Sequence, residues 1–467
     1  MNMKKIISMI VFALCLLPSL GQKPRLVVGI VVDQMRWDYL GSYRSRFSVG
    51  GFNRLMAQGF SFDDTHINYM PSVTACGHSC IYTGSVPALT GIAGNDFYIN
   101  GRRTYCVEDT TVHTIGANDK TGNMSPRNLC VTTIGDELRM ASGFKPKVIG
   151  VSLKDRGAIL SAGHTADAAY WFDNAAGIFV SSSYYMQDLP SWVKDFNRRH
   201  RQGQDIRYTP IGNTLVADMA IEALHNEKLG MRGTTDMLTI SFSSTDYVGH
   251  RYGYQSKELD EVYLALDREL ARVLDALDAQ VGQDNYLLFL TSDHGASVNC
   301  QQAQKHGIPS GRWNVDEKRI SGVKEIHEYR VYLDDKAMGD NVVAQLRKDP
   351  AVAYTFRYDE LHRQTLPEPL RAKVANGYYP GRSGDIQLIL KPGHYIVDND
   401  SYPAGSEHGS PWEYDTHIPF LLMGAGVKHG RSSEAVVVSD IAPTVCSLLD
   451  IQAPSGCVGQ SKAKEVY

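Results

Sequence analysis

Three apolar segments of this chain are each followed by an aspartate, and this pattern constrains the fold more than any other feature. The segments begin at Leu26, Met237 and Tyr286, and the aspartates that follow them are Asp33, Asp246 and Asp293. A continuous apolar run is typical of a strand that is buried on both faces of a parallel sheet. Ligands of open α/β sheets bind beyond the carboxyl ends of the strands. The three aspartates therefore predict a functional site at that edge.

Other segments predict an α/β fold with a central, mostly parallel sheet flanked by helices. Lys147–Leu153 is a further predicted strand, and apolar residues at steps of three and four predict an amphipathic helix over Lys257–Val281. Between Cys300 and Ser406 short strands and Pro/Gly turns replace the strand–helix alternation, which indicates an inserted cap subdomain. The predicted organisation is a signal peptide (1–21), a first catalytic part (22–299), the inserted cap (300–405) and a last catalytic part (406–467).

The amino terminus resembles a secretory signal peptide. Lys4 and Lys5 precede an almost unbroken apolar run from Ile6 to Leu20, and a small-residue cleavage pattern follows. The alternative is a short membrane anchor that is retained. We expect a periplasmic or secreted protein with no stable membrane span once the signal is cleaved.

Cysteine number and net charge limit the remaining possibilities. With Cys15 removed in the signal, the eight cysteines become seven, so at least one thiol stays free in an oxidising compartment. Cys106 with Cys130 and Cys446 with Cys457 are candidate disulfides by local spacing, although spacing does not decide connectivity. A net charge of −4 gives no electrostatic footprint for nucleic acid, and we expect no nucleic-acid partner.

Thr74 is the candidate nucleophile because it lies at the start of a predicted helix between Pro71 and Gly84. The backbone N–H groups that begin a helix favour an anion. A threonine hydroxyl is a weak nucleophile, however, and needs a base or a metal ion to activate it. Cys76 is the alternative reactive group, but a cysteine is more often a small buried residue.

The aspartates and nearby histidines are candidate ligands for a metal ion that could activate Thr74. His250 follows Asp246 by four residues, His294 follows Asp293 directly, and His408 stands in Ser406–Gly409. Carboxylates and imidazoles suit zinc, and six such groups are enough for two ions. Taken singly, each residue is more often a helix cap or a hydrogen-bonded core residue. Their recurrence at the same edge of the sheet favours a shared metal site.

These residues belong to a series of motifs that resembles the alkaline phosphatase superfamily, in particular the phosphate-irrepressible (PafA-type) alkaline phosphatases. The motifs occur in family order along nearly the whole mature chain: Val32-Asp33-Gln34-Met35-Arg36, Thr74-Ala75-Cys76-Gly77-His78, Gly94-Asn95-Asp96, Lys154-Asp155-Arg156-Gly157, Asp246-Tyr247-Val248-Gly249-His250, Ser292-Asp293-His294-Gly295 and His408-Gly409-Ser410-Pro411 with Tyr414–Pro419. The resemblance implies an alkaline-phosphatase-like α/β sandwich with an inserted cap.

The resemblance also implies the role of each site residue. One Zn²⁺ is expected on Asp246, His250 and His408, and a second on Asp33, Asp293, His294 and the Thr74 hydroxyl. Asn95, Lys154 and Arg156 are expected to contact the phosphoryl oxygens, and His417 to support the metal ligands from outside. The implied activity is hydrolysis of small phosphate monoesters through a phosphothreonine intermediate, and we expect a monomer.

Two alternatives remain. Nucleotide pyrophosphatase/phosphodiesterases share the threonine and the ligand types, and only Lys154 and Arg156 favour monoesters over diesters. The chain could also be an inactive metal-binding envelope protein, although no predicted ligand or nucleophile is missing. Sulfatases, by contrast, need a Cys/Ser-x-Pro-x-Arg pattern that the surroundings of Cys76 do not provide.

Overall fold

The computed structural model describes residues 23–314, 320–397, 402 and 404–467. The predicted signal peptide, 1–21, lies outside the described residues. Within them, no helix has both the length and the apolar character needed to cross a membrane.

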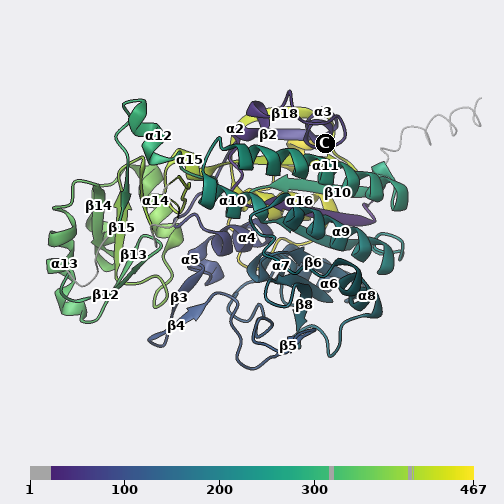
Figure 1. Ribbon diagram of the computed structural model, residues 1–467, viewed down its shortest axis with the longest axis horizontal. Coiled ribbons are helices and arrows are strands. Elements are labelled where there is room, and N and C mark those ends of the chain that lie inside the picture. Colours follow the sequence, from purple (N-terminus) through teal and green to yellow (C-terminus); the bar gives the residue numbers. More distant parts are fainter. Residues whose placement is uncertain (1–22, 315–319, 398–401, 403) are drawn as a thin grey trace, which may run out of the picture.

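A mixed ten-stranded sheet forms the centre of the molecule (Figure 1). In spatial order its strands are β18 (Gly430–Val437), β2 (Phe60–His66), β17 (His417–Gly424), β10 (Tyr286–Thr291), β1 (Leu26–Val32), β9 (Asp236–Phe242), β6 (Val148–Ser152), β7 (Ala168–Asp173), β8 (Ile178–Ser182) and β5 (Thr114–Ile115). The five strands β10, β1, β9, β6 and β7 run parallel to one another. Their carboxyl ends therefore meet at one edge, as the apolar runs predicted.

Alternate residues of β1 contribute to two different hydrophobic cores, because successive side chains of a strand point to opposite faces. Val28 and Ile30 belong to a core shared with helices of one face, whereas Val27 and Val31 belong to a core on the other face. The first face is covered by α3 (Phe52–Gln58), α8 (Ser191–His200), α9 (Pro210–Asn226), α10 (Ser244–Tyr252) and α11 (Lys257–Gln280). The second is covered by α4 (Thr74–Thr83), α6 (Ile134–Ala141), α7 (Asp155–Ala162), α16 (Ile441–Leu449) and α17 (Ala463–Val466). The predicted α/β class with flanking helices is confirmed.

The region predicted to be an inserted cap forms a smaller sheet with its own core, at the left of Figure 1. Its strands lie in the order β12 (Val323–His327), β13 (Arg330–Leu333), β15 (Ile386–Leu390) and β14 (Val352–Arg357). Around it lie α12 (Cys300–Lys305), α13 (Gly339–Leu346), α14 (Glu368–Gly377) and the pair β11 (Gly311–Trp313) and β16 (His394–Ile396). The division of the chain into a catalytic domain and a cap at 300 and 405 stays a prediction.

Short elements complete the edge where the parallel strands end. They are α2 (Asp38–Ser42), α5 (Pro87–Thr90), the hairpin β3 (Asp96–Ile99) and β4 (Arg102–Tyr105), and α15 (Glu413–Thr416).

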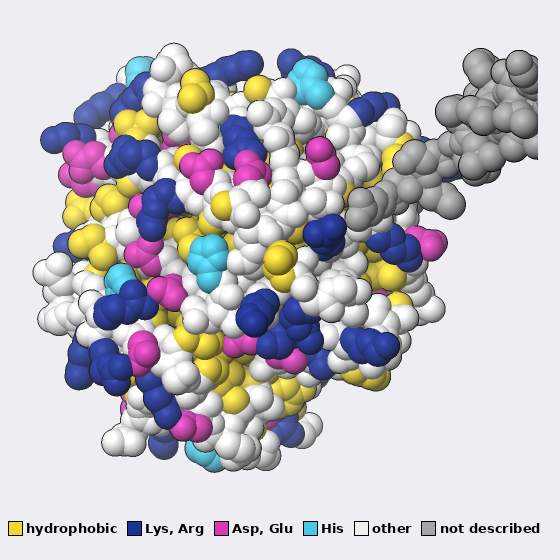
Figure 2. Space-filling view, turned by 90° about the vertical axis from the view of Figure 1, so that its right-hand side faces the viewer, with side chains coloured by type: hydrophobic (Ala, Val, Ile, Leu, Met, Phe, Trp, Pro, Cys, Tyr) yellow, Lys and Arg dark blue, Asp and Glu magenta, His cyan; other side chains and the backbone are white. Residues whose placement is uncertain are grey.

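On the face shown in Figure 2, Lys and Arg side chains are scattered among Asp and Glu side chains. The expectation that nucleic acid is no partner stays a prediction.

The two candidate disulfides are wrong, because all seven cysteines of the described residues are free. The exposed Cys130 thiol donates to the Asn128 carbonyl (3.7 Å). The Cys457 thiol donates to the Gly459 carbonyl (3.8 Å). Each thiol thus has a partner other than the cysteine that spacing assigned to it.

Candidate active site

Thr74 is the first residue of α4, as the sequence predicted, and it is buried. The helix comes close to the end of β10 because Gly77 has no side chain: a Cβ there would lie 2.4 Å from Asp293 Cβ. This approach leaves the Thr74 Oγ1 atom 3.5 Å from His294 Nε2. The next backbone donor of the helix, Ala75 N, is bound by the Asn95 side-chain oxygen (3.0 Å) rather than left open.

Asp33, Asp293 and His294 form the first of two metal-capable sets, and all three are fully buried. One potential ligand atom from each residue lies within 4.8 Å of the others. His294 Nε2 is 3.5 Å from Asp33 Oδ1 and 3.6 Å from Asp293 Oδ2. Neither of these two carboxylate oxygens makes a hydrogen bond of normal geometry, although His78 Nδ1, which donates to the Thr74 carbonyl, lies 3.3 Å from Asp293 Oδ2. Buried polar atoms without partners are costly, so their convergence fits a divalent cation.

Asp246, His250 and His408 form the second set. The sequence placed Asp246 at a strand end, but the structure places it in the first turn of α10. Positions four apart share one helix face, so His250 Nε2 lies 3.1 Å from Asp246 Oδ1. His408 comes from the segment after the predicted cap, and its Nε2 is 3.8 Å from the same oxygen.

All three histidines of these sets present Nε2 to the site because another group holds Nδ1. His408 Nδ1 donates to the Ser72 carbonyl (2.8 Å), and His294 Nδ1 donates to the Gly295 carbonyl (3.0 Å). His250 Nδ1 faces a Glu407 carboxylate oxygen at 3.1 Å. Such outer partners are typical of metal-binding histidines, since they fix the tautomer and leave one nitrogen free for the ion.

Burial lowers the pKa of two of these imidazoles, and acidic neighbours raise that of the third. Burial lowers the pKa of His294, and burial together with the neighbouring His294 and His250 lowers the pKa of His408. Both rings are therefore neutral near pH 7, which is the form that binds a metal. Burial also lowers the pKa of His250, but Asp246 and Glu407 outweigh it and raise the pKa well above its ordinary value.

Lys154 joins the two sets from the end of β6. Its Nζ lies 2.6 Å from Asp33 Oδ2, 2.6 Å from Asp246 Oδ2 and 3.4 Å from Thr74 Oγ1. Burial lowers the Lys154 pKa, but the carboxylates Asp246 and Asp33 outweigh it and raise the pKa above its ordinary value. Burial, then Asp246 and Asp293, raises the pKa of Asp33. A positive charge is thus fixed beside the Thr74 hydroxyl.

Asn95 and Arg156 each line a cavity next to residues of this centre. Asn95 and His408 line a cavity of about 210 Å³ together with Glu328, whose carboxylate accepts the Asn95 backbone N–H (3.1 Å). Arg156 lines a neighbouring cavity of about 180 Å³ with Lys154, and its guanidinium donates to the Tyr105 hydroxyl (2.9 Å). The structure thus gathers Thr74, Lys154 and the six metal-capable residues, with the Asn95 side chain bound to Ala75 N beside Thr74 and Arg156 in the cavity that Lys154 also lines.

Gln34 is a site residue that sequence reasoning missed. Its side-chain Nε2 donates to Asp246 Oδ1 (2.8 Å), and its backbone N–H donates to Asp293 Oδ1 (3.2 Å). It is buried, and its φ of 62° lies in the left-handed region that non-glycine residues seldom adopt. One strained residue therefore contacts an aspartate of each set.

We expect Gln34→Ala to weaken metal binding at the Asp246 set by roughly 10–100-fold, the usual cost of losing an outer hydrogen-bond partner. The Asp293 set is expected to change less, because the backbone donor remains. Chelator competition with zinc-loaded protein measures both affinities. Gln58→Ala, which removes an exposed amide, is the control, and an unchanged affinity at both sets would contradict the role of Gln34.

The expected supporting role of His417 near the metal ligands needs correction. His417 does not contact either metal-capable set: its ring stacks on Trp37 (4.6 Å between centroids) and on His66 (4.5 Å). The reason is that His417 begins β17, where it pairs with His66 across the sheet.

The Cys76 thiol is fully buried and donates to the Ile92 carbonyl (3.3 Å), and burial raises its pKa well above the ordinary value, which makes it unreactive.

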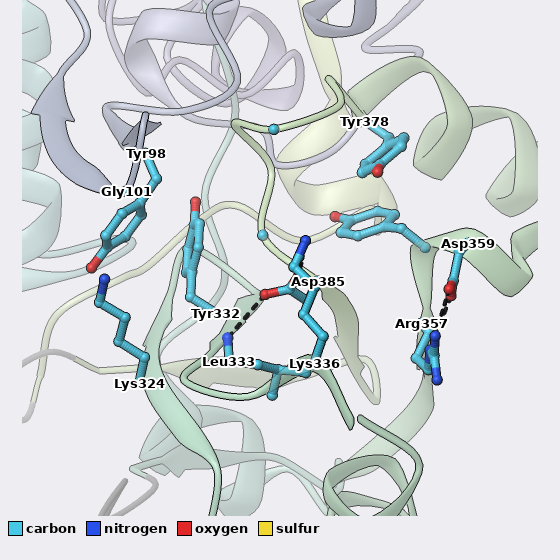
Figure 3. A pocket seen from close by; sticks show the side chains of 13 residues that line it. Tyr98, Gly101, Lys324, Tyr332, Leu333, Lys336, Arg357, Asp359, Tyr378 and Asp385 are labelled. Atoms are coloured by element: carbon cyan, nitrogen blue, oxygen red, sulfur yellow. Dashed lines mark hydrogen bonds and ion pairs between the residues drawn. The ribbon is translucent and has the colours of Figure 1, made fainter. Parts of the chain in front are cut away.

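A further cavity, of about 380 Å³, opens between the β3–β4 hairpin and the small sheet (Figure 3). Two of its three basic side chains pair with carboxylates of its own walls, and the third lies over an aromatic ring. Lys324 Nζ lies over the Tyr98 ring at 4.3 Å, Lys336 pairs with Asp385, and an Arg357–Asp359 pair lies at the rim (Figure 3). No predicted site residue lines it, so the active site is assigned to the edge of the large sheet.

Comparison with known proteins agrees with this geometry. Residues 27–416 match the family model of type I phosphodiesterase / nucleotide pyrophosphatase. The chain is 41% identical to alkaline phosphatase PafA of Elizabethkingia meningoseptica, over 94% of each protein. It is 40% identical to alkaline phosphatase PhoV of Synechococcus elongatus, over 95% of this chain and 93% of the relative.

A solved structure gives the same result. The crystal structure of wild-type alkaline phosphatase PafA superposes with a TM-score of 0.91 at 40% identity, covering 95% of this chain and 99% of that chain. The predicted alkaline-phosphatase-like fold is confirmed. The chain therefore belongs to the type I phosphodiesterase/nucleotide pyrophosphatase family of the alkaline phosphatase superfamily, and it is similar to the PafA-type alkaline phosphatases over nearly its whole length.

Proposed function

We propose that this protein is an alkaline phosphatase that hydrolyses phosphate monoesters at a two-zinc site through a phosphothreonine intermediate. The observation that carries the proposal is the position of the Thr74 hydroxyl. It lies beside His294 and Lys154, next to two sets of buried metal-capable donors. The similarity to alkaline phosphatases over more than nine-tenths of the chain supports the same reaction.

The donor chemistry supports Zn²⁺ in both sets. Each combines imidazole nitrogen with carboxylate oxygen, a combination that suits zinc better than magnesium or calcium. Asp33, Asp293, His294 and Thr74 would hold one ion, and Asp246, His250 and His408 the other. When bound, the ions supply positive charge that lowers the pKa of the Thr74 hydroxyl and offsets charge on the phosphoryl group.

The reaction takes place in two displacements. In the first, the deprotonated Oγ1 of Thr74 forms a bond to phosphorus while the bond from phosphorus to the leaving oxygen breaks. In the second, a water oxygen bonds to phosphorus and the bond to Oγ1 breaks, which returns Thr74 and releases inorganic phosphate. Burial of Thr74 keeps bulk water away from the hydroxyl.

Lys154, Arg156 and Asn95 are assigned to the phosphoryl oxygens. A monoester carries one more negative charge on these oxygens than a diester does, so fixed cations discriminate between them. Lys154 supplies a buried ammonium 3.4 Å from the nucleophile. The Asn95 side chain reaches the start of α4, where its oxygen accepts the Ala75 backbone N–H.

A diesterase is the second candidate, because the matching family model carries that name. The same threonine and metal-capable sets would serve it, and only the cations beside Thr74 favour monoesters. An inactive binding protein is disfavoured because the chain keeps Thr74 and two groups of metal-capable side chains beside it. The signal-like amino terminus supports a periplasmic or secreted location, and monomeric state remains part of the proposal.

We expect zinc-loaded protein to hydrolyse p-nitrophenyl phosphate with a kcat/KM far above that for bis-p-nitrophenyl phosphate. The physical reason is the extra charge that Lys154 and Arg156 meet on a monoester. Steady-state kinetics on both substrates gives the ratio. A chelator should stop both reactions and zinc should restore them, which is the control for a metal-dependent activity. A higher kcat/KM for the diester would contradict the monoesterase proposal and favour a phosphodiesterase.

A further inference from the structure

A third group of metal-capable side chains lies apart from the two sets described above. Asp64 and His66 come from β2, and His417 begins β17. The two strands pair antiparallel with His66 directly opposite His417. One potential ligand atom from each of the three residues lies within 4.8 Å of the others. Neither catalytic set contributes to this group.

A fourth donor faces both imidazoles. Glu413, the first residue of α15, places Oε1 3.6 Å from His66 Nε2 and 3.6 Å from His417 Nδ1. Both separations exceed a hydrogen bond. They are close to the roughly 3.3 Å between ligand atoms in a tetrahedral zinc site with bonds of about 2.0–2.1 Å. The Asp64 Oδ1 atom lies 2.8 Å from His66 Nε2, so a small shift completes the same spacing.

The tautomer of His417 is fixed in the form that binds a metal. Its Nε2 lies 2.9 Å from the Asp63 backbone carbonyl, which can only accept, so this nitrogen carries the proton. In a neutral ring the acceptor is then Nδ1, the nitrogen that faces Glu413. A histidine whose second nitrogen donates to a backbone carbonyl is the usual arrangement in metal sites, and His294 and His408 show it in the catalytic sets.

The group is also held rigidly and remains accessible. The His417 ring lies between Trp37 and His66, stacked on both. The side chains of His66 and His417 are about a fifth exposed, whereas Glu413 is 71% exposed. An ion can thus enter from solvent without disturbing the core.

From these observations we propose that Asp64, His66, Glu413 and His417 form a third, non-catalytic metal site that takes Zn²⁺ or a similar divalent transition metal. Two imidazole nitrogens and two carboxylate oxygens suit such ions, whereas Ca²⁺ and Mg²⁺ prefer oxygen alone. A metal on His66 Nε2 would replace the 2.8 Å contact of this nitrogen with Asp64 Oδ1, and the neutral ring would then carry its one proton on Nδ1.

The site connects segments that carry catalytic residues. The Trp37 backbone N–H donates to the His417 carbonyl (3.1 Å), and Trp37 stands four residues after Asp33. The Gly295 N–H donates to the Asp415 carbonyl (2.8 Å), which joins α15 to the residue after His294. An ion bound by Glu413 and His417 would tie α15 and β17 to β2, beside both segments.

Zinc stoichiometry tests the proposal. Metal-free protein is dialysed against buffered free zinc, and bound zinc is counted by elemental analysis for the wild type, His66→Ala, Glu413→Ala and His362→Ala. We expect His66→Ala to bind one zinc fewer than the wild type across the range in which the third equivalent fills. Loss of a direct ligand should weaken that equivalent by more than the roughly 100-fold upper cost of losing an outer partner.

Glu413→Ala guards against a folding defect, because this side chain is largely exposed, and it should weaken the same equivalent. His362→Ala removes an exposed histidine of the cap region and should bind as the wild type does. Equal stoichiometry in the wild type and both site variants at every zinc concentration would overturn the proposal. The readout is a difference of one ion, so it does not depend on how the catalytic sets behave.

Discussion

Thr74→Ala is expected to lower kcat for phosphate monoesters by on the order of 10⁴-fold or more, the scale of loss when a covalent nucleophile is removed. The fold should survive, because the Thr74 hydroxyl makes only marginal contacts, 3.5 Å to His294 and 3.4 Å to Lys154. Zinc content should fall little, since six other ligands remain. Single-turnover kinetics and elemental analysis measure the two effects.

Two matched variants control for this result. Thr74→Ser keeps a hydroxyl at the same atom and should retain much of the activity. Thr83→Ala removes the hydroxyl at the opposite end of α4, which only donates to the Ser79 carbonyl and accepts from the Ser85 N–H, and should leave kcat nearly unchanged. Activity of Thr74→Ala near the wild-type level would remove this residue from the mechanism.

Lys154→Ala combined with Arg156→Ala is expected to lower kcat/KM for p-nitrophenyl phosphate by roughly 10³-fold or more, while the diester loses much less. The estimate follows from the roughly 10²–10³-fold cost of removing one preorganised donor from a charged transition state. The monoester depends on these cations more because its phosphoryl group carries the larger charge. The ratio of kcat/KM for the two substrates is the measurement.

The Lys154→Ala/Arg156→Ala variant needs a control for its effect on metal binding. Lys154 pairs with Asp33 and Asp246, so its removal also changes the surroundings of two proposed ligands. Zinc content must therefore be measured beside the kinetics. Lys194→Ala with Arg198→Ala removes the same two charge types from the exposed face of α8 and should change neither substrate. An equal loss for both substrates would contradict the assigned role of the pair.

The central strands could be predicted because their residues are buried on both faces of the sheet. β1 and β10 read as continuous apolar runs because each touches a core on either side of the sheet. β2 and β18 were missed for the opposite reason. β2 carries Asp63 and Asp64 in its middle, and β18 lies at the sheet edge with most of its residues exposed or half-buried. A strand is recognised in the sequence by its buried apolar residues, and β2 and β18 have few of them.

The same limit applies to the site. The ligand residues could be predicted because three of them follow apolar strands, and a resemblance joined them to Thr74. Gln34 was missed because its partner Asp246 is 212 residues away, and a single glutamine carries no pattern of its own. Glu407 was missed although it directly precedes His408, because its carboxylate contacts His250 of the distant helix α10. Contacts between distant segments become visible only once the chain is folded.

The stereochemical course at phosphorus tests the central claim most directly. Zinc-loaded protein is given a monoester made chiral with three oxygen isotopes together with an alcohol acceptor, and the configuration of the phosphate ester formed by transfer to that alcohol is determined. Two successive in-line displacements, onto Thr74 and then onto the acceptor, each invert phosphorus, so the account predicts overall retention. Overall inversion would mean a single direct displacement and would contradict a phosphothreonine intermediate.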